Sequence, residues 1–273
     1  MTFNIDDFKQ LGYFTHAFDH LSALTTIKAT CQEMAITFFG DKFTSLENYH
    51  QIPLTEQQHE EFQYAVFTRL NSEKKHRDFV ADNIHFFTAL FGPDLDVQTN
   101  MYLRIARPGQ ELDNIGIHRD TDYGNSAYEL SLSLPLVSQV EGCGLNVIPK
   151  SHLFTERNIE QFNREDVERG TPKNEMGFLY APKKILGIEE NQLQCISLPF
   201  GSGLGFSLGL IHGQKANQTQ MTRWAIDFRV KNSFHPLTKN LKQGYYTTLQ
   251  TSVISQLGQA YYELNDEERS TLC

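Results

Sequence analysis

The sequence is poor in cysteine and tryptophan. Its 273 residues include four cysteines and one tryptophan. No two cysteines form a CxxC pair, and sparse thiols in a chain of this length are typical of a reducing compartment. These features exclude a disulfide framework and argue against a zinc–thiolate site. The four residues concerned are Cys31, Cys143, Cys195 and Cys273.

The sequence also lacks a long apolar run. No stretch approaches the roughly 18 apolar residues that a membrane-spanning helix requires. The first residues, MTFNIDDFKQLGYF, carry acidic groups and no apolar segment where a signal peptide would have basic and then apolar residues. We therefore expect a cytoplasmic protein that does not insert into membranes.

Basic residues are in the minority. Lys and Arg number 24 against 33 Asp and Glu, which gives a net charge of −9. A protein that coats nucleic acid through its phosphates needs the opposite balance, so we expect no nucleic-acid partner. The apolar fraction of 40%, with 20 Phe and 11 Tyr, suits one globular domain over residues 1–273.

Residues 1–96 have the pattern of a mostly helical N-terminal support. Residues 21–38 repeat apolar side chains at three- and four-residue steps, which predicts a helix that ends before Gly40. Thr55 and Gln58 have capping-box spacing and predict the start of a second helix. A third helical stretch, about 79–91, is expected to stop at Gly92-Pro93.

Residues 97–235 have a different pattern, with many short strand-like segments separated by Gly, Pro and Asn. YELSLSLPLV alternates with a period of two, and GLNVIPKSH, LQCISLPF, GLGFSLGLIHG and TRWAIDFRV are further candidates. The pattern predicts a mainly β protein with flanking helices and an antiparallel barrel or jelly-roll core. The tail, 236–273, is expected to be helical.

A candidate metal site begins with His118 and Asp120 in IGIHRDTDYG. On a strand, residues two apart point to the same face, so both side chains can reach one ion. His212, near the end of a later strand, can supply a third ligand. Two imidazoles and one carboxylate that leave open positions form the facial triad of non-haem Fe(II) oxygenases.

A candidate co-substrate site follows this histidine. Arg223 lies eleven residues after His212, and a hairpin through the polar segment GQKANQTQM would return it beside the metal on the neighbouring strand. Its guanidinium would pair with the distal carboxylate of a 2-oxo acid. Thr222 can add a hydroxyl donor. Arg229, on the same face, is a competing candidate, or a partner for Asp227 or another acid.

GIHRD, GLNVIPKSH and GLIHG with Arg223 resemble the Fe(II)/2-oxoglutarate dioxygenases of the phytanoyl-CoA hydroxylase-like superfamily. DNIGIHRDTDYGN and TRWAIDFRV resemble a branch found in sugar and aminoglycoside biosynthetic clusters. The resemblance covers about residues 100–232 and implies a double-stranded β-helix, a cupin-like jelly roll. Two positions depart from the family pattern: Lys150 replaces a common glycine in Pro149–His152, and Ala225 replaces a serine.

The resemblance implies that His118, Asp120 and His212 hold Fe(II) and that Arg223 holds 2-oxoglutarate, with O2 as the oxidant. Related halogenases lack the carboxylate, so Asp120 favours hydroxylation.

A small polar metabolite such as a sugar or aminoglycoside-like precursor is the expected substrate. Tyr102 and Arg104 alternate on one strand and can line the pocket mouth. Tyr123 lies in the polar loop after the metal ligands, and Asn146 lies on a strand near the core.

Other functions fit parts of this pattern. A cupin-like metal-dependent isomerase or hydrolase would share the barrel, but it would usually carry more histidine ligands and leave Arg223 without a role. A catalytically silent binding protein could retain the fold. A protein target and the oligomeric state are left open by the sequence.

Overall fold

The computed structural model describes residues 4–155, 160–161, 170–178, 185–186, 188–236 and 244–263. The helices are α1 Ile5–Leu11, α2 Ser22–Phe39, α3 Glu56–Glu73, α4 Lys75–Asp82, α5 Ile84–Phe91, α6 Pro172–Glu175 and α7 Val253–Glu263. The strands are β1 Tyr13–Ala17, β2 Leu95–Gln98, β3 Tyr102–Ala106, β4 His118–Arg119, β5 Glu129–Pro135, β6 Leu145–Val147, β7 Glu160–Gln161, β8 Ile185–Leu186, β9 Gln194–Ile196, β10 Ser202–Ser207, β11 Ile211–Gly213, β12 Arg223–Asn232 and β13 Tyr246–Gln250.

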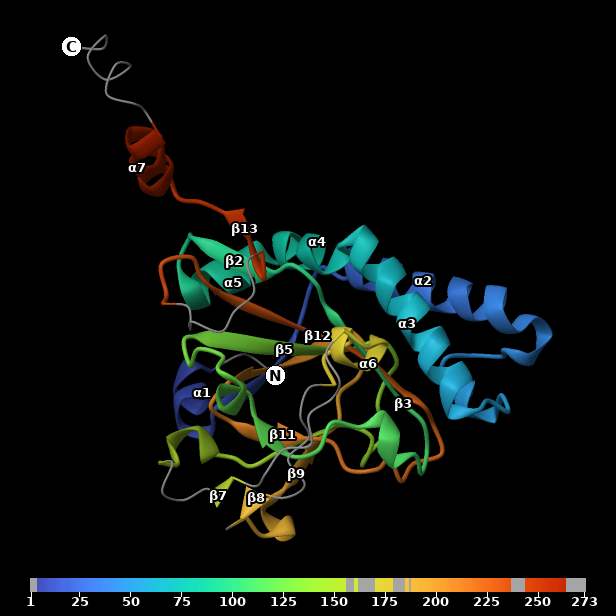
Figure 1. The fold of residues 1–273 in the computed structure, drawn as a ribbon. Coiled ribbons are helices and arrows are strands. Elements are labelled where there is room, and N and C mark those ends of the chain that lie inside the picture. The colour runs from blue at the N-terminus through green and yellow to red at the C-terminus, as the bar shows by residue number, and fades with distance from the viewer. Residues whose placement is uncertain are drawn as a thin grey trace.

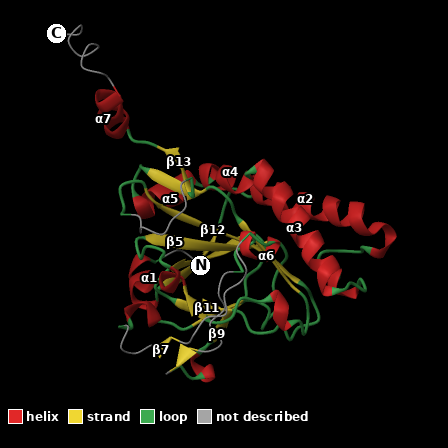
Figure 2. Cartoon of the chain, viewed as in Figure 1, coloured by secondary structure: helices red, strands yellow, loops and turns green. Residues whose placement is uncertain are grey.

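Two larger antiparallel sheets and the two-stranded pair β7-β8 form the β part of the described residues (Figures 1 and 2). The larger has the order β1-β10-β5-β12-β2-β13, and β3 also pairs with β12. The smaller has the order β4-β11-β6-β9. The sheets meet where the ring of His212 on β11 lies 4.4 Å from the ring of Phe206 on β10. The prediction of a sheet-rich protein with flanking helices is therefore confirmed.

The helices α2–α5 cover one face of the larger sheet (Figure 1). The even-numbered residues of β12 point toward them: Trp224 donates from its indole to the carbonyl of Leu46, and Phe228 contacts His76. Such alternation is expected of a strand whose two faces meet different surroundings. The odd-numbered residues of β12 therefore face the space between the sheets.

The helix boundaries follow local sequence signals. Thr55 and Gln58 make the predicted capping box at the start of α3, and α2 ends at Gly40 as predicted. The stretch predicted as one helix over about 79–91 is two, because the chain turns at Asn83, whose side-chain amide donates to the carbonyls of His20 and Phe79.

Both terminal regions contain strands that the sequence patterns did not predict. β1 interrupts the helical N-terminal part and pairs with β10. In the tail, expected to be helical, Tyr246–Gln250 forms β13 on β2, and only α7 follows it as a helix among the residues described there. Both strands are edge additions whose pairing partners lie far away in sequence, so local periodicity carries little signal for them.

Candidate metal centre

Three potential metal ligands converge between the sheets. His118 on β4 pairs in register with His212 on β11, so the two imidazoles share one face of the smaller sheet. Their ring centroids are 4.4 Å apart, and Nε2 of His118 lies 3.5 Å from Oδ1 of Asp120. One donor atom from each residue lies within 4.8 Å of the other two, and all three residues are buried.

The backbone fixes the tautomer of each histidine. Nδ1 of His118 donates to the carbonyl of Gly116 at 2.7 Å, and Nδ1 of His212 donates to the carbonyl of Leu210 at 2.9 Å. A carbonyl can only accept, so the proton of the neutral ring lies on Nδ1 and the lone pair on Nε2. This arrangement prepares a histidine to ligate a metal through Nε2.

The electrostatics of the cluster also suit a cation. Burial lowers the pKa of His212 to about 4, and the adjacent His118 acts in the same direction. The ring is therefore neutral near pH 7. Burial opposes the ionisation of Asp120, yet Arg229 and the imidazoles hold the pKa of that carboxyl far below its usual range. A neutral imidazole at His212 and a carboxylate at Asp120 are the result.

Arg229 orients the carboxylate of Asp120. Its Nη2 lies 3.1 Å from Oδ1 of Asp120, and its Nη1 donates to Oδ1 of Asn125 at 2.8 Å and to the hydroxyl of Tyr245 at 2.7 Å. The amide of Asn125 donates in turn to the backbone carbonyl of Asp120 at 2.9 Å. Arg229 is thus a partner of an acid, one of the two roles that the sequence left open for it.

Replacing Arg229 by methionine is expected to weaken Ni(II) binding about 10- to 100-fold, the usual effect of removing a group that orients a ligand. Arg229→Lys should restore part of the loss, because a single donor can still reach Asp120. Calorimetric titration of Ni(II) measures both variants against Arg69→Met, which removes an exposed arginine paired with Glu73. Equal or tighter binding in Arg229→Met would show that Arg229 only balances the charge of Asp120.

Arg223 is buried at the start of β12 with an exposed fraction of 1%. Its Nε and Nη1 donate to no group in the described part of the chain. Burial lowers the pKa of its guanidinium, and Asp227 opposes that shift. A buried guanidinium with unused donors is unfavourable unless a ligand completes it. Arg223 has unused N–H donors, whereas Arg229 already contacts Asp120, Asn125 and Tyr245, so Arg223 is the better candidate to bind a carboxylate ligand.

The predicted hairpin between His212 and Arg223 is wrong. β11 belongs to the smaller sheet and β12 to the larger one, so the two residues come from opposing sheets and not from neighbouring strands. Arg223 lies on the same odd-numbered face of β12 as Arg229, whose Nη2 is 3.1 Å from Oδ1 of Asp120. Arg223 and the metal cluster therefore border the same interior.

Thr222 does not join this interior. Its hydroxyl accepts from the backbone N–H of His50 at 3.0 Å and lies 3.1 Å from Nδ1 of the same residue. Its own N–H donates to the carbonyl of Glu47. The interpretation of Thr222 as a co-substrate donor is corrected: it lies one residue before Arg223, points to the opposite face, and fastens the loop before α3 to β12.

The predicted substrate residues differ in their surroundings. Tyr102 and Arg104 share a face as predicted, but Arg104 is engaged by Asp227 and by the carbonyl of Met176. Asn146 lies opposite Gly213, the residue after His212. Because side chains alternate along a strand, Asn146 points to the face of the smaller sheet opposite to that of His212. The backbone of Tyr123 ends a short 3-10 turn that begins at Asp120, and its side chain lies outside the described part of the structure.

The turn Pro149–His152 supports the histidine strand. Lys150 has a φ of 68°, the left-handed conformation that glycine adopts without strain, at the position where the sequence pattern lacks its usual glycine. The hydroxyl of Ser151 accepts from the N–H of Ile211 at 2.8 Å and so anchors β11 beside His212. His152 contacts the carbonyl of Lys9, which fits a structural residue.

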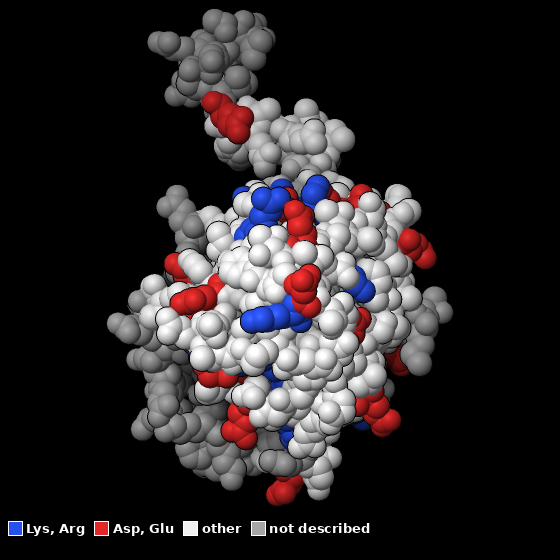
Figure 3. All heavy atoms as spheres, turned by 90° about the vertical axis from the view of Figure 1, so that its right-hand side faces the viewer, with Lys and Arg blue, Asp and Glu red and all other residues white. Residues whose placement is uncertain are grey.

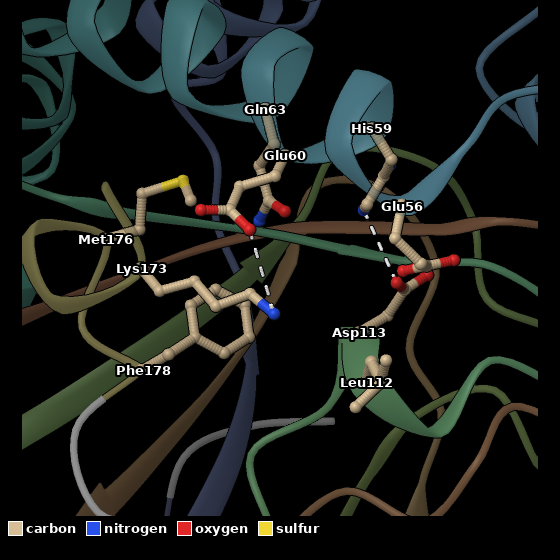
Figure 4. Close-up of a pocket in the computed structure, with 9 residues that line it drawn as sticks. All are labelled: Glu56, His59, Glu60, Gln63, Leu112, Asp113, Lys173, Met176 and Phe178. Atoms are coloured by element: carbon tan, nitrogen blue, oxygen red, sulfur yellow. Dashed lines mark ion pairs between the residues drawn. The ribbon is translucent and has the colours of Figure 1, made fainter. Parts of the chain in front are cut away.

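A separate small pocket lies between α3, α6 and the turn at Glu111–Asp113 (Figure 4). Nζ of Lys173 is 3.8 Å from Oε2 of Glu60, and Nε2 of His59, whose pKa burial lowers to about 4, is 3.4 Å from Oδ1 of Asp113. Asp113 also accepts two hydrogen bonds from the guanidinium of Arg107. Each carboxylate of the pocket thus has a cationic partner, because Arg107 also pairs with Glu56, and we assign the pocket no ligand.

Charge is mixed on the molecular face that Figure 3 shows, where Lys and Arg alternate with Asp and Glu and form no stripe of one sign. No helix in the described ranges has both the length and the apolar character needed to cross a membrane.

Solved structures share this fold, although no model of a protein family and no curated protein matches the sequence. The non-heme monooxygenase ThoJ, in its apo form, is 17% identical, with a TM-score of 0.53 over 90% of this chain and 83% of that chain. The non-heme alpha-ketoglutarate-dependent carbocyclase SnoK of nogalamycin biosynthesis is 14% identical, with a TM-score of 0.51 over 89% and 94%.

The epimerase SnoN, in a complex with Fe3+, alpha-ketoglutarate and nogalamycin RO, is 11% identical, with a TM-score of 0.50 over 90% of this chain and 96% of that chain. At these identities the likeness establishes a shared fold and leaves the reaction to be argued from the site. The chain has the fold of non-heme oxygenases and a buried His-Asp-His group that could hold a metal ion.

Proposed function

We propose that the protein is a non-haem Fe(II)- and 2-oxoglutarate-dependent oxygenase that hydroxylates a small polar metabolite, such as a sugar or an aminoglycoside-like precursor. One observation carries the proposal: a buried two-histidine, one-carboxylate cluster borders the same interior as a buried arginine with unused donors. An isomerase or hydrolase on a similar barrel has no use for that arginine. The names of the similar structures support the metal and the co-substrate and leave the reaction open: ThoJ is a non-heme monooxygenase, SnoK an alpha-ketoglutarate-dependent carbocyclase, and SnoN an epimerase in a complex with Fe3+ and alpha-ketoglutarate.

The residues fit both groups that the proposal requires. His118 and His212 would bind Fe(II) through Nε2, because each Nδ1 is committed to a carbonyl, and Asp120 would add a carboxylate oxygen. This donor set is the one that leaves coordination positions open for other ligands. Arg223 would receive the distal carboxylate of 2-oxoglutarate through its unused donors.

When bound, Fe(II) and 2-oxoglutarate supply the oxidising chemistry, in which O2 is consumed, succinate and CO2 are formed and a substrate C–H bond is hydroxylated. The residues of the chain position the metal ligands. Arg229 and Asn125 hold Asp120, the Gly116 and Leu210 carbonyls hold the imidazoles, and burial between the sheets limits access of bulk water. We further propose that the two sheets form a double-stranded β-helix.

The proposal is tested by incubating the purified protein with Fe(II), 2-oxoglutarate and O2 and measuring succinate. Many enzymes of this chemistry turn over slowly without a primary substrate, so we expect succinate that depends on Fe(II) and disappears with a chelator. A protein that binds Fe(II) but neither binds nor converts 2-oxoglutarate would contradict the proposal and favour a metal-dependent isomerase or hydrolase. Failure to bind Fe(II) would favour a silent binding protein.

A further inference from the structure

Asp227 lies in the middle of the interior face of β12, two positions before Arg229 and four after Arg223. All three side chains lie on one face of the strand, and Nη2 of Arg229 is 3.1 Å from Oδ1 of Asp120 in the metal cluster. Asp227 therefore lies between the metal cluster and the candidate co-substrate arginine.

Only one oxygen of this carboxylate is engaged. Oδ2 accepts from Nε of Arg104 at 3.0 Å, and Nη1 of Arg104 donates to the carbonyl of Met176 at 2.9 Å. The Arg104 guanidinium also lies over the rings of Tyr102 and Phe178, at 5.1 and 5.3 Å from their centroids. Arg104 is thus held on several sides and keeps the Asp227 carboxylate in a fixed orientation.

The other oxygen, Oδ1, is buried and accepts no hydrogen bond from the residues that the structure describes. A buried carboxylate oxygen normally has a donor, and its absence is unfavourable. The proposed co-substrate cannot provide one, because 2-oxoglutarate at neutral pH carries acceptors only. A hydroxyl of the primary substrate, in place of a water molecule, can therefore complete this oxygen beside the co-substrate.

The surroundings of Oδ1 favour a neutral donor. Two guanidinium groups flank Asp227: Arg104 pairs with it, and Arg223 interacts with it along β12. Arg104 already neutralises this carboxylate, and 2-oxoglutarate would neutralise Arg223, so an ammonium group would find no unpaired negative charge here, whereas a hydroxyl needs none. Tyr102 and Ser133 lie directly opposite Asp227 on the two neighbouring strands, so their side chains extend the same polar face.

We propose that Oδ1 of Asp227 accepts a hydrogen bond from a hydroxyl group of the primary substrate, and that the Arg104–Asp227 pair selects neutral polyhydroxylated compounds over cationic amines. The inference rests on the proposed oxygenase function, because that function places 2-oxoglutarate on Arg223 and leaves Asp227 to the second substrate. It narrows the substrate class to compounds that offer neutral hydroxyl donors at this position.

The test uses protein loaded with Ni(II) and 2-oxoglutarate, which cannot turn over, and two probes of similar size. The probes are myo-inositol, which carries hydroxyl groups alone, and 2-deoxystreptamine, in which two positions carry ammonium groups. Binding of each probe is measured by calorimetry in the wild type, in Asp227→Asn and in Asp96→Asn. Asp96 is the matched control, because it also pairs with a cation of β12, Lys231, but both of its oxygens are engaged.

We expect myo-inositol to bind the wild type more tightly than 2-deoxystreptamine. Its affinity should fall about tenfold in Asp227→Asn, the loss expected for one hydrogen bond to a charged group. Asp96→Asn should match the wild type. Equal affinity for myo-inositol in the wild type and Asp227→Asn, tighter binding of the diamine, or no binding of myo-inositol would overturn the inference.

A parallel titration with 2-oxoglutarate separates this inference from the proposed function. Asp227→Asn should bind 2-oxoglutarate within a few-fold of the wild type, and a large loss would mean that Asp227 serves to orient Arg223 and would overturn the inference. If the wild type itself fails to bind 2-oxoglutarate, the proposed function is wrong, whatever the probes show.

Discussion

Replacing His212 by alanine is expected to lower the affinity for divalent metal by more than about 100-fold. Removal of a group that only orients a metal ligand already lowers the affinity about 10- to 100-fold. The imidazole is one of three donors in the cluster, and its Nδ1 is committed to the carbonyl of Leu210. Alanine leaves two donors, and succinate formation should fall to background. Calorimetric titration of Ni(II) and the succinate assay measure the two effects.

His20→Ala is the control for this variant, because His20 is exposed and only its backbone bonds to Asn83. Since alanine also removes a ring packed against Phe206, the thermal midpoint of each variant should be recorded. His212→Gln keeps most of the volume and separates a loss of ligation from a loss of packing. Undiminished metal binding in a folded His212→Ala protein would show that the cluster does not hold the ion.

Replacing Arg223 by methionine is expected to have opposite effects on binding and on stability. The affinity for 2-oxoglutarate should fall about 100- to 1000-fold, because hydrogen bonds between charged partners contribute about 1.5–3 kcal/mol each. The free energy of unfolding without ligands should rise by about 1–3 kcal/mol, because methionine removes a buried charge with unused donors. Affinity for Ni(II) should stay near that of the wild type.

Chemical denaturation measures the stability of Arg223→Met, and competition binding measures its affinity for 2-oxoglutarate. Arg69→Met, at an exposed arginine paired with Glu73, should change neither. A gain of stability together with a loss of binding is typical of residues kept for function at a cost to the fold. A variant that is destabilised and still binds 2-oxoglutarate would assign Arg223 a structural role.

Residues close in sequence were the most predictable part of the site. The spacing of His118 and Asp120 predicted that both could reach one ion, although β4 ends at Arg119 and Asp120 opens the 3-10 turn that follows. His212 was located by its place at the end of an apolar strand segment. The structure brings all three together. Similarly, the alternation in YELSLSLPLV predicted β5, and the spacing of Thr55 and Gln58 predicted the start of α3.

Relations between the sheets were not predictable from local pattern. The chain leaves β11 in one sheet and enters β12 in the other, whereas a short polar connection suggests a hairpin. Alternation places Thr222 on the face opposite Arg223, whereas its hydroxyl suggests a donor for the same ligand. The pairing of Arg229 with Asp120 depends on residues more than 100 positions apart, for which a single sequence gives no signal.

The most direct test of the central claim is an anaerobic titration of the Fe(II)-loaded protein with 2-oxoglutarate, followed by absorbance. Chelation of Fe(II) by a 2-oxo acid produces a visible metal-to-ligand charge-transfer band, which reports metal, co-substrate and their contact in one signal. We expect a band that saturates near one equivalent in the wild type, is absent in His212→Ala and needs about 100-fold more 2-oxoglutarate in Arg223→Met. No band in the wild type, or an unchanged band in His212→Ala, would contradict the account.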